Sequence, residues 1–294
     1  MTDNDIAVRV RGLVKRYPGK VAVAGVDLDI YAGEVFALLG PNGAGKTTTT
    51  EVLEGYRRRD EGEVSVLGTD PAKADRRWRS RIGIVAQSSR DEAEASVAEL
   101  VHHYAGYYPN PRDPDEVIAA VGLESKRKTR TRKLSGGQRR RLDVALGVVG
   151  NPELLFLDEP TTGFDPEARR QFWQLIEALR TGGTTILLTT HYLDEAEHLA
   201  DRVGVIADGR MIEIGTPESL GGRGARVARV RWLDADGARE IRTDQPTAEV
   251  AALISRFDGE IPELSIHRPS LEDVYLELIR TNTAAAELEA GVPA

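Results

Sequence analysis

Gly-Pro-Asn-Gly-Ala-Gly-Lys-Thr, at residues 40–47, is the stretch that decides the fold of this chain. It fits the phosphate-binding pattern Gly-x-x-x-x-Gly-Lys-Ser/Thr at every fixed position. The pattern lies between a predicted buried strand, residues 34–39, and a predicted helix that starts at Thr47. Glycines let the backbone curl until several N–H groups face a phosphate, and the start of the helix adds positive potential there. The sequence therefore predicts a phosphate site at this loop.

The loop also supplies two side chains with chemical roles. Lys46 is expected to reach the β- and γ-phosphates of a nucleotide, where it would act in catalysis as well as in binding. The hydroxyl of Thr47 is expected to ligate Mg²⁺. The other loop residues predicted to contact the nucleotide are Gly40, Asn42, Gly43, Gly45 and Thr48.

The composition is that of an ordinary globular protein. Of the 294 residues, 40% are hydrophobic and 29% are charged, and no run approaches the roughly 18 apolar residues that span a bilayer. The polar first residues do not form a signal peptide. The lack of cysteine excludes disulfides and thiolate metal sites and fits a cytoplasmic protein. The net charge of −8 argues against nucleic acid as a partner.

Strand and helix patterns alternate along most of the chain, which predicts an α/β fold with a mostly parallel core sheet. Alternating stretches at residues 7–10, 21–30 and 63–67 predict an antiparallel β layer beside it. A composition change near residue 221 marks the start of a small α+β domain. The expected division is residues 1–220 for the nucleotide-binding domain, 221–283 for the accessory domain and 284–294 for a disordered tail rich in Ala and Glu.

A strand that ends in two carboxylates is the second chemical element. The apolar run at residues 154–157 is followed directly by Asp158 and Glu159. Because open α/β sheets bind ligands at the carboxyl ends of their strands, Asp158 is expected to hold Mg²⁺, directly or through water. Glu159 is placed to polarise the attacking water. The alternative interpretation is a solvated Asp-Glu pair at the start of a helix.

Leu134-Ser135-Gly136-Gly137-Gln138 makes the prediction specific. This pentapeptide resembles the signature motif of the ATP-binding cassette (ABC) ATPases, and further motifs of that family follow in order over about residues 5–218. The resemblance implies a phosphate-loop NTPase cassette with a helical signature subdomain, ATP and Mg²⁺ as cofactors, and ATP hydrolysis as the activity.

The resemblance also implies roles for residues outside the loop. Tyr17 lies where the adenine-stacking aromatic belongs, and Gln87 matches the loop glutamine that senses the γ-phosphate and the metal. His191 matches the switch histidine that bridges to the γ-phosphate. Asp165 follows Phe164, which stands where Leu is usual, and is expected to contact the opposite subunit. The remaining histidines are expected to be structural: His102, His103, His198 and His267.

A second copy of this chain is the expected partner, because two cassettes of this family sandwich two nucleotides head to tail. Each ATP would then touch the phosphate loop of one copy and the signature motif of the other. The signature residues expected to make this contact are Ser135, Gly136, Gly137 and Gln138. Ser135 could instead do no more than begin a helix, since serine is a good N-cap.

A single cassette without a membrane span resembles the motor subunit of a transporter. It would sit at the cytoplasmic face of the cell membrane, bound to a separate transmembrane permease. The stretch 268–276, Arg-Pro-Ser-Leu-Glu-Asp-Val-Tyr-Leu, is similar to a motif of daunorubicin/doxorubicin-type resistance exporters and favours drug or antibiotic efflux. Another cargo (a lipid, a polysaccharide or an ion) and a soluble ABC ATPase without transport are the alternatives.

Three further patterns have two interpretations each. Nine basic residues in the sixteen positions 126–141 could steer ATP or form solvated helix faces. Tyr104, Tyr107 and Tyr108 could belong to a local core or to a socket for a partner protein. The apolar stripe of a predicted helix over residues 270–280 could be local core or a contact with another subunit.

Overall fold

The computed structural model describes residues 6–85, 94–225, 228–257 and 259–289. The chain divides into two compact units, Met1–Ile214 and Gly215–Ala294. The division falls slightly before the expected boundary at residue 221, because the last strand of the core sheet ends at Gly215.

The first unit is built around a six-stranded sheet with the strand order β5-β6-β7-β3-β8-β9. The five strands from β5 to β8 in this order pair in parallel, which confirms the predicted α/β core. A tight turn at Asp208 and Gly209, both with positive φ, leads from β8 into β9. The strands of this sheet are β3 (Val35–Leu39), β5 (Ile82–Val85), β6 (Leu154–Asp158), β7 (Thr185–Thr189), β8 (Arg202–Ala207) and β9 (Arg210–Gly215).

Side chains of the core strands alternate between two apolar clusters. In β6, Leu155 and Leu157 join a cluster formed with the helices. Leu154 and Phe156 join a second cluster formed with the antiparallel strands. Because successive residues of a strand point to opposite faces, a strand covered on both sides needs a continuous apolar run. The core sheet is therefore the middle layer of this unit.

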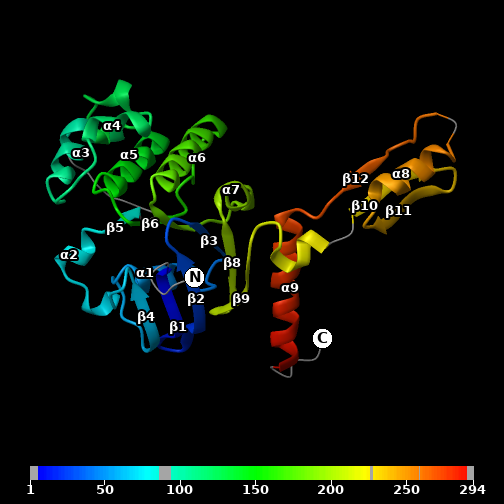
Figure 1. Ribbon diagram of the computed structural model, residues 1–294, viewed down its shortest axis with the longest axis horizontal. Helices are drawn as coiled ribbons and strands as arrows, with labels where there is room; N and C mark the ends of the chain where they lie inside the picture. Colours follow the sequence, from blue (N-terminus) through cyan, green and yellow to red (C-terminus); the bar gives the residue numbers. More distant parts are fainter. Residues whose placement is uncertain (1–5, 86–93, 226–227, 258, 290–294) are drawn as a thin grey trace. The chain divides into compact units, whose positions relative to one another are not determined.

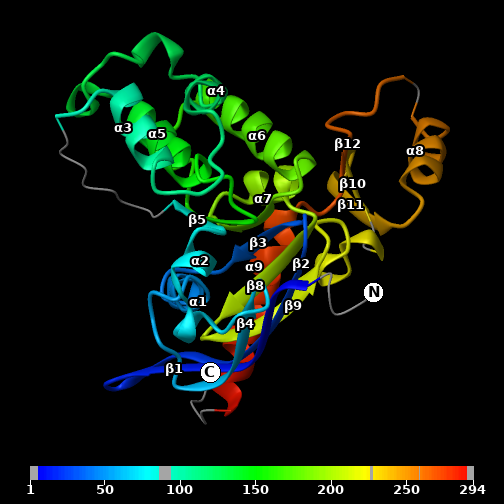
Figure 2. The ribbon, with the colours of Figure 1, turned by 60° about the vertical axis from the view of Figure 1, so that its left-hand side comes forward.

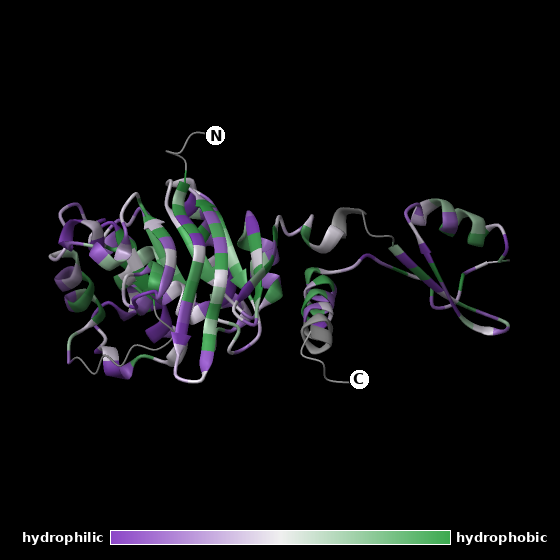
Figure 3. Ribbon diagram, turned by 90° about the horizontal axis from the view of Figure 1, so that it is seen from below, coloured by the Kyte–Doolittle hydropathy of each residue, from purple (hydrophilic) through white to green (hydrophobic). Residues whose placement is uncertain are grey.

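An antiparallel sheet with the order β2-β1-β4 covers one face of the core sheet, as predicted. Its strands alternate between hydrophobic and hydrophilic residues, which Figure 3 shows along their length. Helix α1 contributes Val52 and Leu53 to the same cluster. The elements of this layer are β1 (Ile6–Tyr17), β2 (Lys20–Tyr31), β4 (Glu61–Val66) and α1 (Lys46–Leu53).

Helices cover the other face, and Figures 1 and 2 show the larger ones gathered there. Two of them, α5 and α6, begin directly after a capping residue. Ser135 and Asp165 are N-caps whose side chains accept backbone N–H bonds, so the helices begin at the residues that follow. The helices of the unit are α2 (Arg76–Arg79), α3 (Val97–Ala105), α4 (Pro114–Ala120), α5 (Gly136–Val148), α6 (Pro166–Thr181) and α7 (Leu193–Leu199), with short 3-10 turns at η2 (Pro71–Lys73), η3 (Glu124–Lys126) and η4 (Thr131–Lys133).

The second unit contains a small sheet with the order β11-β10-β12, which confirms the predicted α+β domain. Helix α8 packs against it through a core of Val230, Leu253 and Ile261. The elements of this unit are η5 (Leu220–Ala225), β10 (Ala228–Asp234), β11 (Gly237–Thr243), α8 (Pro246–Ile254), β12 (Ser265–His267) and α9 (Leu271–Glu289).

Helix α9 is longer than the sequence predicts. Its N-cap is Ser270, because the Ser270 Oγ accepts from the Asp273 N–H at 3.1 Å. The helix continues past residue 280 to Glu289, so residues 284–289 are helical where disorder was expected; Ala and Glu are strong helix formers. Residues 290–294 of the expected tail lie outside the described residues. On the apolar stripe Leu271 and Val274 are fully buried, and α9 packs against η5.

Candidate active site

The phosphate loop joins β3 to α1 through two glycines with positive φ. Gly43 has φ 81° and Gly45, the N-cap of α1, has φ 108°. A Cβ on Gly45 would lie 2.5 Å from the carbonyl oxygen of Ala22 on β2, so no other residue fits there. Helix α1 therefore begins directly at Lys46, with its first N–H groups at the loop.

Lys46 lies inside the loop rather than in solvent. Its Nζ donates to the carbonyl oxygens of Gly40 at 2.6 Å and Pro41 at 3.2 Å, and the residue is only 8% exposed. Burial lowers the pKa of the Lys46 ammonium, while the carboxylates of Glu159 and Asp158 oppose this shift. The two carboxylates are therefore close enough to share one electrostatic environment with the lysine.

A cavity of about 280 Å³ opens beside the loop. Two of the residues that line it, Lys20 and Ala22, were missed by sequence reasoning. Lys20 pairs with Tyr17 across the turn between β1 and β2, and hairpin register was the signal that could have found it. All other lining residues were predicted for the site: Tyr17, Asn42, Gly43, Gly45, Lys46, Thr47, Thr48, Asp158 and Glu159.

The two carboxylates are held by the next strand of the sheet. Asp158 is the last residue of β6, and the Thr189 hydroxyl at the end of β7 donates to its Oδ1. The N–H of Glu159 donates to the Thr189 carbonyl oxygen at 2.9 Å. Thr189 therefore fixes both residues, and the sequence did not single it out because its role depends on strand pairing.

His191 lies next to Glu159. Its Nδ1 is 3.3 Å from Glu159 Oε1, and its ring lies against Tyr192 with the centroids 4.1 Å apart. The side chain is 46% exposed, so the imidazole can still contact a group outside this chain. Parallel strands bring their carboxyl ends to one edge, which places the residues after β6 and β7 together.

The signature residues lie away from this cavity, at the start of α5. Ser135 and Gln138 form a capping box: the Ser135 Oγ accepts from the Gln138 N–H, and Gln138 Oε1 accepts from the Ser135 N–H at 3.1 Å. Ser135 and Gly136 are exposed. A Cβ on Gly136 or Gly137 would meet nothing within 4 Å, so neither glycine is required by the packing of this chain.

Asp165 caps α6, since its Oδ1 accepts from the Ala168 N–H at 2.8 Å. Its neighbour Phe164 is buried, and its ring packs edge-on against the ring of Phe172, with the two ring centroids 6.0 Å apart. Gln87 lies outside the described residues.

The donors at the cavity suit Mg²⁺. Thr47 offers a hydroxyl and Asp158 a carboxylate, and Mg²⁺ is commonly held by one or two such ligands together with substrate phosphates and water. No group of three or more His, Cys, Asp or Glu side chains among the described residues could hold a metal ion by itself. This donor set fits a metal ion that arrives with the nucleotide.

Glu54 is a further carboxyl near Asp158 that the sequence did not indicate. It is the C-cap of α1 and is partly buried. Burial, followed by the negative charges of Asp158 and Glu51, raises its pKa to about 8. A protonated Glu54 would add no negative charge beside Asp158.

The remaining histidines have local partners, in line with the structural interpretation. His102 lies 2.9 Å from Asp115, and His267 lies 3.0 Å from Asp273. His103 hydrogen-bonds with Tyr107, and His198 stacks on Trp173. In the basic run, Arg127 pairs with Asp115, Arg130 with Glu99 and Arg132 with Glu94, which favours solvated faces over steering.

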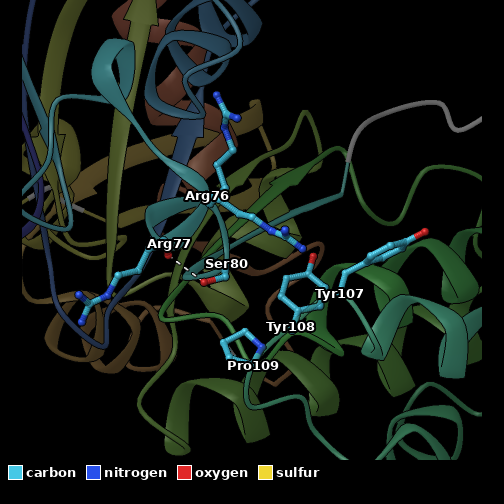
Figure 4. A pocket seen from close by; sticks show the side chains of 7 residues that line it. Arg76, Arg77, Ser80, Tyr107, Tyr108 and Pro109 are labelled. Atoms are coloured by element: carbon cyan, nitrogen blue, oxygen red, sulfur yellow. Dashed lines mark hydrogen bonds between the residues drawn. The ribbon is translucent and has the colours of Figure 1, made fainter.

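The three tyrosines divide between the two interpretations. Tyr104 and Tyr108 pack against the helical core, and Tyr107 is 56% exposed. Tyr107 and Tyr108 also border a surface hollow of about 700 Å³, which Figure 4 shows between their rings and α2. The residues around this hollow are Arg76, Arg77, Arg79, Ser80, Tyr107, Tyr108 and Pro109.

Known proteins share both the motifs and the fold. The ABC transporter family matches residues 23–162, which hold the loop, the signature and both carboxylates. The daunorubicin/doxorubicin resistance ATP-binding protein DrrA of Streptomyces peucetius is 40% identical over 320 residues, covering 96% of this chain and 97% of that protein. The Nod factor export ATP-binding protein I of Rhizobium johnstonii is 43% identical over 220 residues, covering 73% of this chain and 71% of that protein.

Among solved structures, the fold matches a dimeric ATP-binding cassette in a post-hydrolysis state, bound to ADP and Pi. The TM-score is 0.65 at 24% identity, and the match covers 71% of this chain and 98% of that chain. This chain therefore belongs to the ABC transporter family and is an ATP-binding cassette ATPase, a subunit that hydrolyses ATP to drive transport. In the described part of the chain, no helix has the length and apolar character needed to cross a membrane.

Proposed function

We propose that this chain powers a drug or antibiotic exporter by hydrolysing Mg-ATP in the cavity beside the phosphate loop. The observation that carries the catalytic part is the convergence of Lys46, Thr47, Asp158 and Glu159 on one cavity, with His191 against Glu159. Lys46 would neutralise the β- and γ-phosphates. Thr47, Asp158 and Gln87 would hold Mg²⁺, which would offset charge on the transferred phosphoryl group.

Glu159 would act on the attacking water, and His191 would bridge to the γ-phosphate. The 3.3 Å contact between the two side chains supports this division, because it lets the imidazole orient the carboxylate. Tyr17 would stack on the base at the outer end of the cavity. The guanidinium of Arg57 lies over the Tyr17 ring, 5.3 Å from its centroid, and makes a cation–π contact with it.

A second copy of the chain would complete each site. Ser135, Gly136 and Gly137 are not among the residues that line the cavity of their own chain, and the two glycines leave open space around their Cα atoms at the start of α5. A helix start of this kind suits an anion, so the γ-phosphate bound by the opposite copy is the natural ligand. Gln138 would hold the turn through the capping box, and Asp165 would contact the opposite copy.

A transmembrane permease would be the second partner and would keep the chain at the cytoplasmic face of the membrane. The surface hollow beside Tyr107 and Tyr108 is the proposed contact, because it combines exposed aromatic area with the arginines of α2. It also lies in the unit that hydrolyses ATP, so a permease seated there would be linked directly to the cassette.

Drug or antibiotic export is the cargo assignment that the relatives favour. DrrA matches over 96% of this chain, which takes in most of the second unit. The Nod factor export protein supports a different cargo as an alternative, because its sequence identity to this chain is slightly higher than that of DrrA, although over a shorter span. A lipid, a polysaccharide or an ion is therefore the second candidate.

Purification from the native membrane tests both parts of the proposal. A tagged full-length chain should bring down one membrane protein, and cells that express the pair should accumulate less drug than cells with the empty vector. The matched control is the same pair with Glu159→Gln, which should assemble but leave accumulation at the level of the empty vector. Equal accumulation with and without an ATPase-competent pair would reject drug export, and loss of the membrane protein from the purified material would reject the permease.

The Glu159→Gln chain also tests the catalytic site. It should bind ATP and keep only a small residual rate of turnover, because an amide cannot act as a base. ATP should then trap a stable dimer, which size-exclusion chromatography with Mg-ATP detects. Hydrolysis at the parent rate would remove Glu159 from the proposed role.

A further inference from the structure

The backbone at Glu159 has a conformation that glutamate rarely adopts. Its φ is 45°, in the left-handed region where a side chain is strained. The next residue is Pro160, and a proline favours an extended conformation in the residue before it. Both effects favour a different backbone conformation for Glu159, so contacts with the surrounding structure must stabilise the conformation that it adopts.

Hydrogen bonds surround this residue on each side. The Glu159 N–H donates to the Thr189 carbonyl oxygen at 2.9 Å, and the Thr162 N–H donates to the Glu159 carbonyl oxygen at 3.3 Å. Both of these bonds come from backbone groups. They hold the N–H and the carbonyl of Glu159 itself.

Arg140, on helix α5, bonds the carbonyls of the two residues that flank Glu159. Its Nη2 donates to the carbonyl oxygen of Asp158, and its Nε donates to the carbonyl oxygen of Pro160 at 3.1 Å. One guanidinium therefore bonds the residue before Glu159 and the residue after it. Arg140 is only 7% exposed, so water does not compete freely for these carbonyls.

We propose that Arg140 is a positioning residue that clamps the backbone on both sides of Glu159 and thereby holds its carboxylate in the reactive orientation. The inference rests on the proposed catalytic role of Glu159. Arg140 lies on α5, the helix that begins with the signature glycines. The clamp therefore also links the signature segment, which would meet the nucleotide of the opposite copy, to Glu159 in the site of the same chain.

The charge of Arg140 suits this position. Burial lowers its pKa from the ordinary value, and the carboxylates of Asp143, Asp158, Glu159 and Glu195 oppose that shift. The guanidinium fork is planar and fixed, which lets it bond two carbonyls at once; a lysine ammonium is a point charge on a flexible stem. Lysine at this position should therefore hold one carbonyl but not both.

The chain offers a matched control one residue away. Arg141 lies on the same helix, but its Nη1 donates to the Gly122 carbonyl oxygen at 3.2 Å and to Gln171 Oε1 at 3.3 Å. These contacts are within the helical layer and do not involve Asp158, Glu159 or Pro160. Arg140→Met and Arg141→Met thus remove the same group from the same helix with different predicted effects.

Single-turnover ATP hydrolysis by the full-length chain is the measurement, together with ATP affinity and the thermal unfolding midpoint. Misplacement of a catalytic group by about 1 Å can slow a reaction on the order of 100-fold. Arg140→Met should therefore lower the hydrolysis rate about 10- to 100-fold with ATP affinity within about threefold of the parent. Arg140→Lys should give an intermediate rate, and Arg141→Met should stay within about twofold of the parent.

A double-variant comparison separates positioning from general damage. If Arg140 acts through the Glu159 carboxylate, Arg140→Met should lower the residual rate of a Glu159→Gln chain by less than about twofold. An equal loss in both backgrounds would overturn the clamp, and so would an Arg140→Met rate within twofold of the parent. If Arg140→Met does not fold, Arg140→Lys replaces it, and its rate is compared with the parent rate and between the parent and Glu159→Gln backgrounds. A Glu159→Gln chain that hydrolyses ATP at the parent rate would instead overturn the catalytic assignment, and the clamp with it.

Discussion

Glu54 should make the stability of the protein depend on pH between about pH 6 and pH 8, and Glu54→Gln should remove that dependence. The pKa of the folded state is raised from an ordinary 4.5 to about 8. Between these two values the folded chain holds a proton that the unfolded chain has released. The contribution of Glu54 to the free energy of unfolding is therefore fully present below pH 4.5 and is lost as the pH rises through 8.

The size of the effect follows from proton linkage. Each pH unit over which the folded chain binds one more proton than the unfolded chain changes the unfolding free energy by about 1.4 kcal/mol. Between pH 6 and pH 8 the parent should thus lose about 2 kcal/mol relative to Glu54→Gln. For a unit of this size that difference corresponds to roughly 4–8 °C in unfolding midpoint.

Thermal unfolding without nucleotide or divalent cation, measured by circular dichroism from pH 5 to pH 9, is the assay. The amide of Gln resembles the neutral carboxyl in shape but does not titrate, so the gap between the two unfolding midpoints should be smallest at pH 5. The curves should then separate toward pH 8.5, with the variant more stable. Midpoints that run parallel from pH 6 to pH 9 would refute the raised pKa of Glu54.

Three other changes test the rest of the assignment. Lys46→Ala removes the cation that lies in the phosphate loop and should lower kcat/KM for ATP about 100-fold or more, whereas ATPase activity within twofold of the parent would contradict the site. Ser135→Arg should block the site of the opposite copy; mixed with Lys46→Ala, it should give dimers with one intact site, and the absence of both occluded ATP and hydrolysis in such dimers would oppose the head-to-tail arrangement. A chain stopped after Leu220 keeps the whole first unit and should still bind ATP, though with poorer solubility or assembly, and a folded truncated chain that fails to bind ATP would show that the second unit completes the nucleotide site.

The nucleotide cavity could be predicted from sequence because its parts are local. The loop geometry is encoded by consecutive residues, since Gly43 and Gly45 occupy conformations that other residues avoid. Asp158 and Glu159 follow a continuous apolar run, which identifies a strand buried on both faces. The parallel arrangement of such strands then brings their carboxyl ends together, and with them Lys46 and the two carboxylates.

The parts that the sequence did not indicate depend on contacts across the fold. Lys20 reaches the cavity through hairpin register, and Glu54 feels the charge of Asp158 although the two residues are far apart in the sequence. Arg140 was read as one more member of a basic run, and nothing in its neighbourhood along the chain indicates that it is buried. The start of α6 at Pro166 depends on Asp165, which caps the helix although the family resemblance assigned it only a contact with the opposite copy.

Two departures from ordinary local rules lie at the proposed functional groups. Among the described residues with positive φ that are not glycine, Asn151 and Asp208 are of types that tolerate it, whereas Leu67, Glu159 and Glu263 are not; of these three, Glu159 is the one that precedes a proline. Gly136 and Gly137 open a helix where neither φ nor packing requires glycine. Arg140 lies on the same helix as these glycines and bonds the backbone around Glu159. A displacement of α5 by a bound partner would therefore reach the carboxylate through one side chain, and the strain at Glu159 would make its orientation depend on that contact.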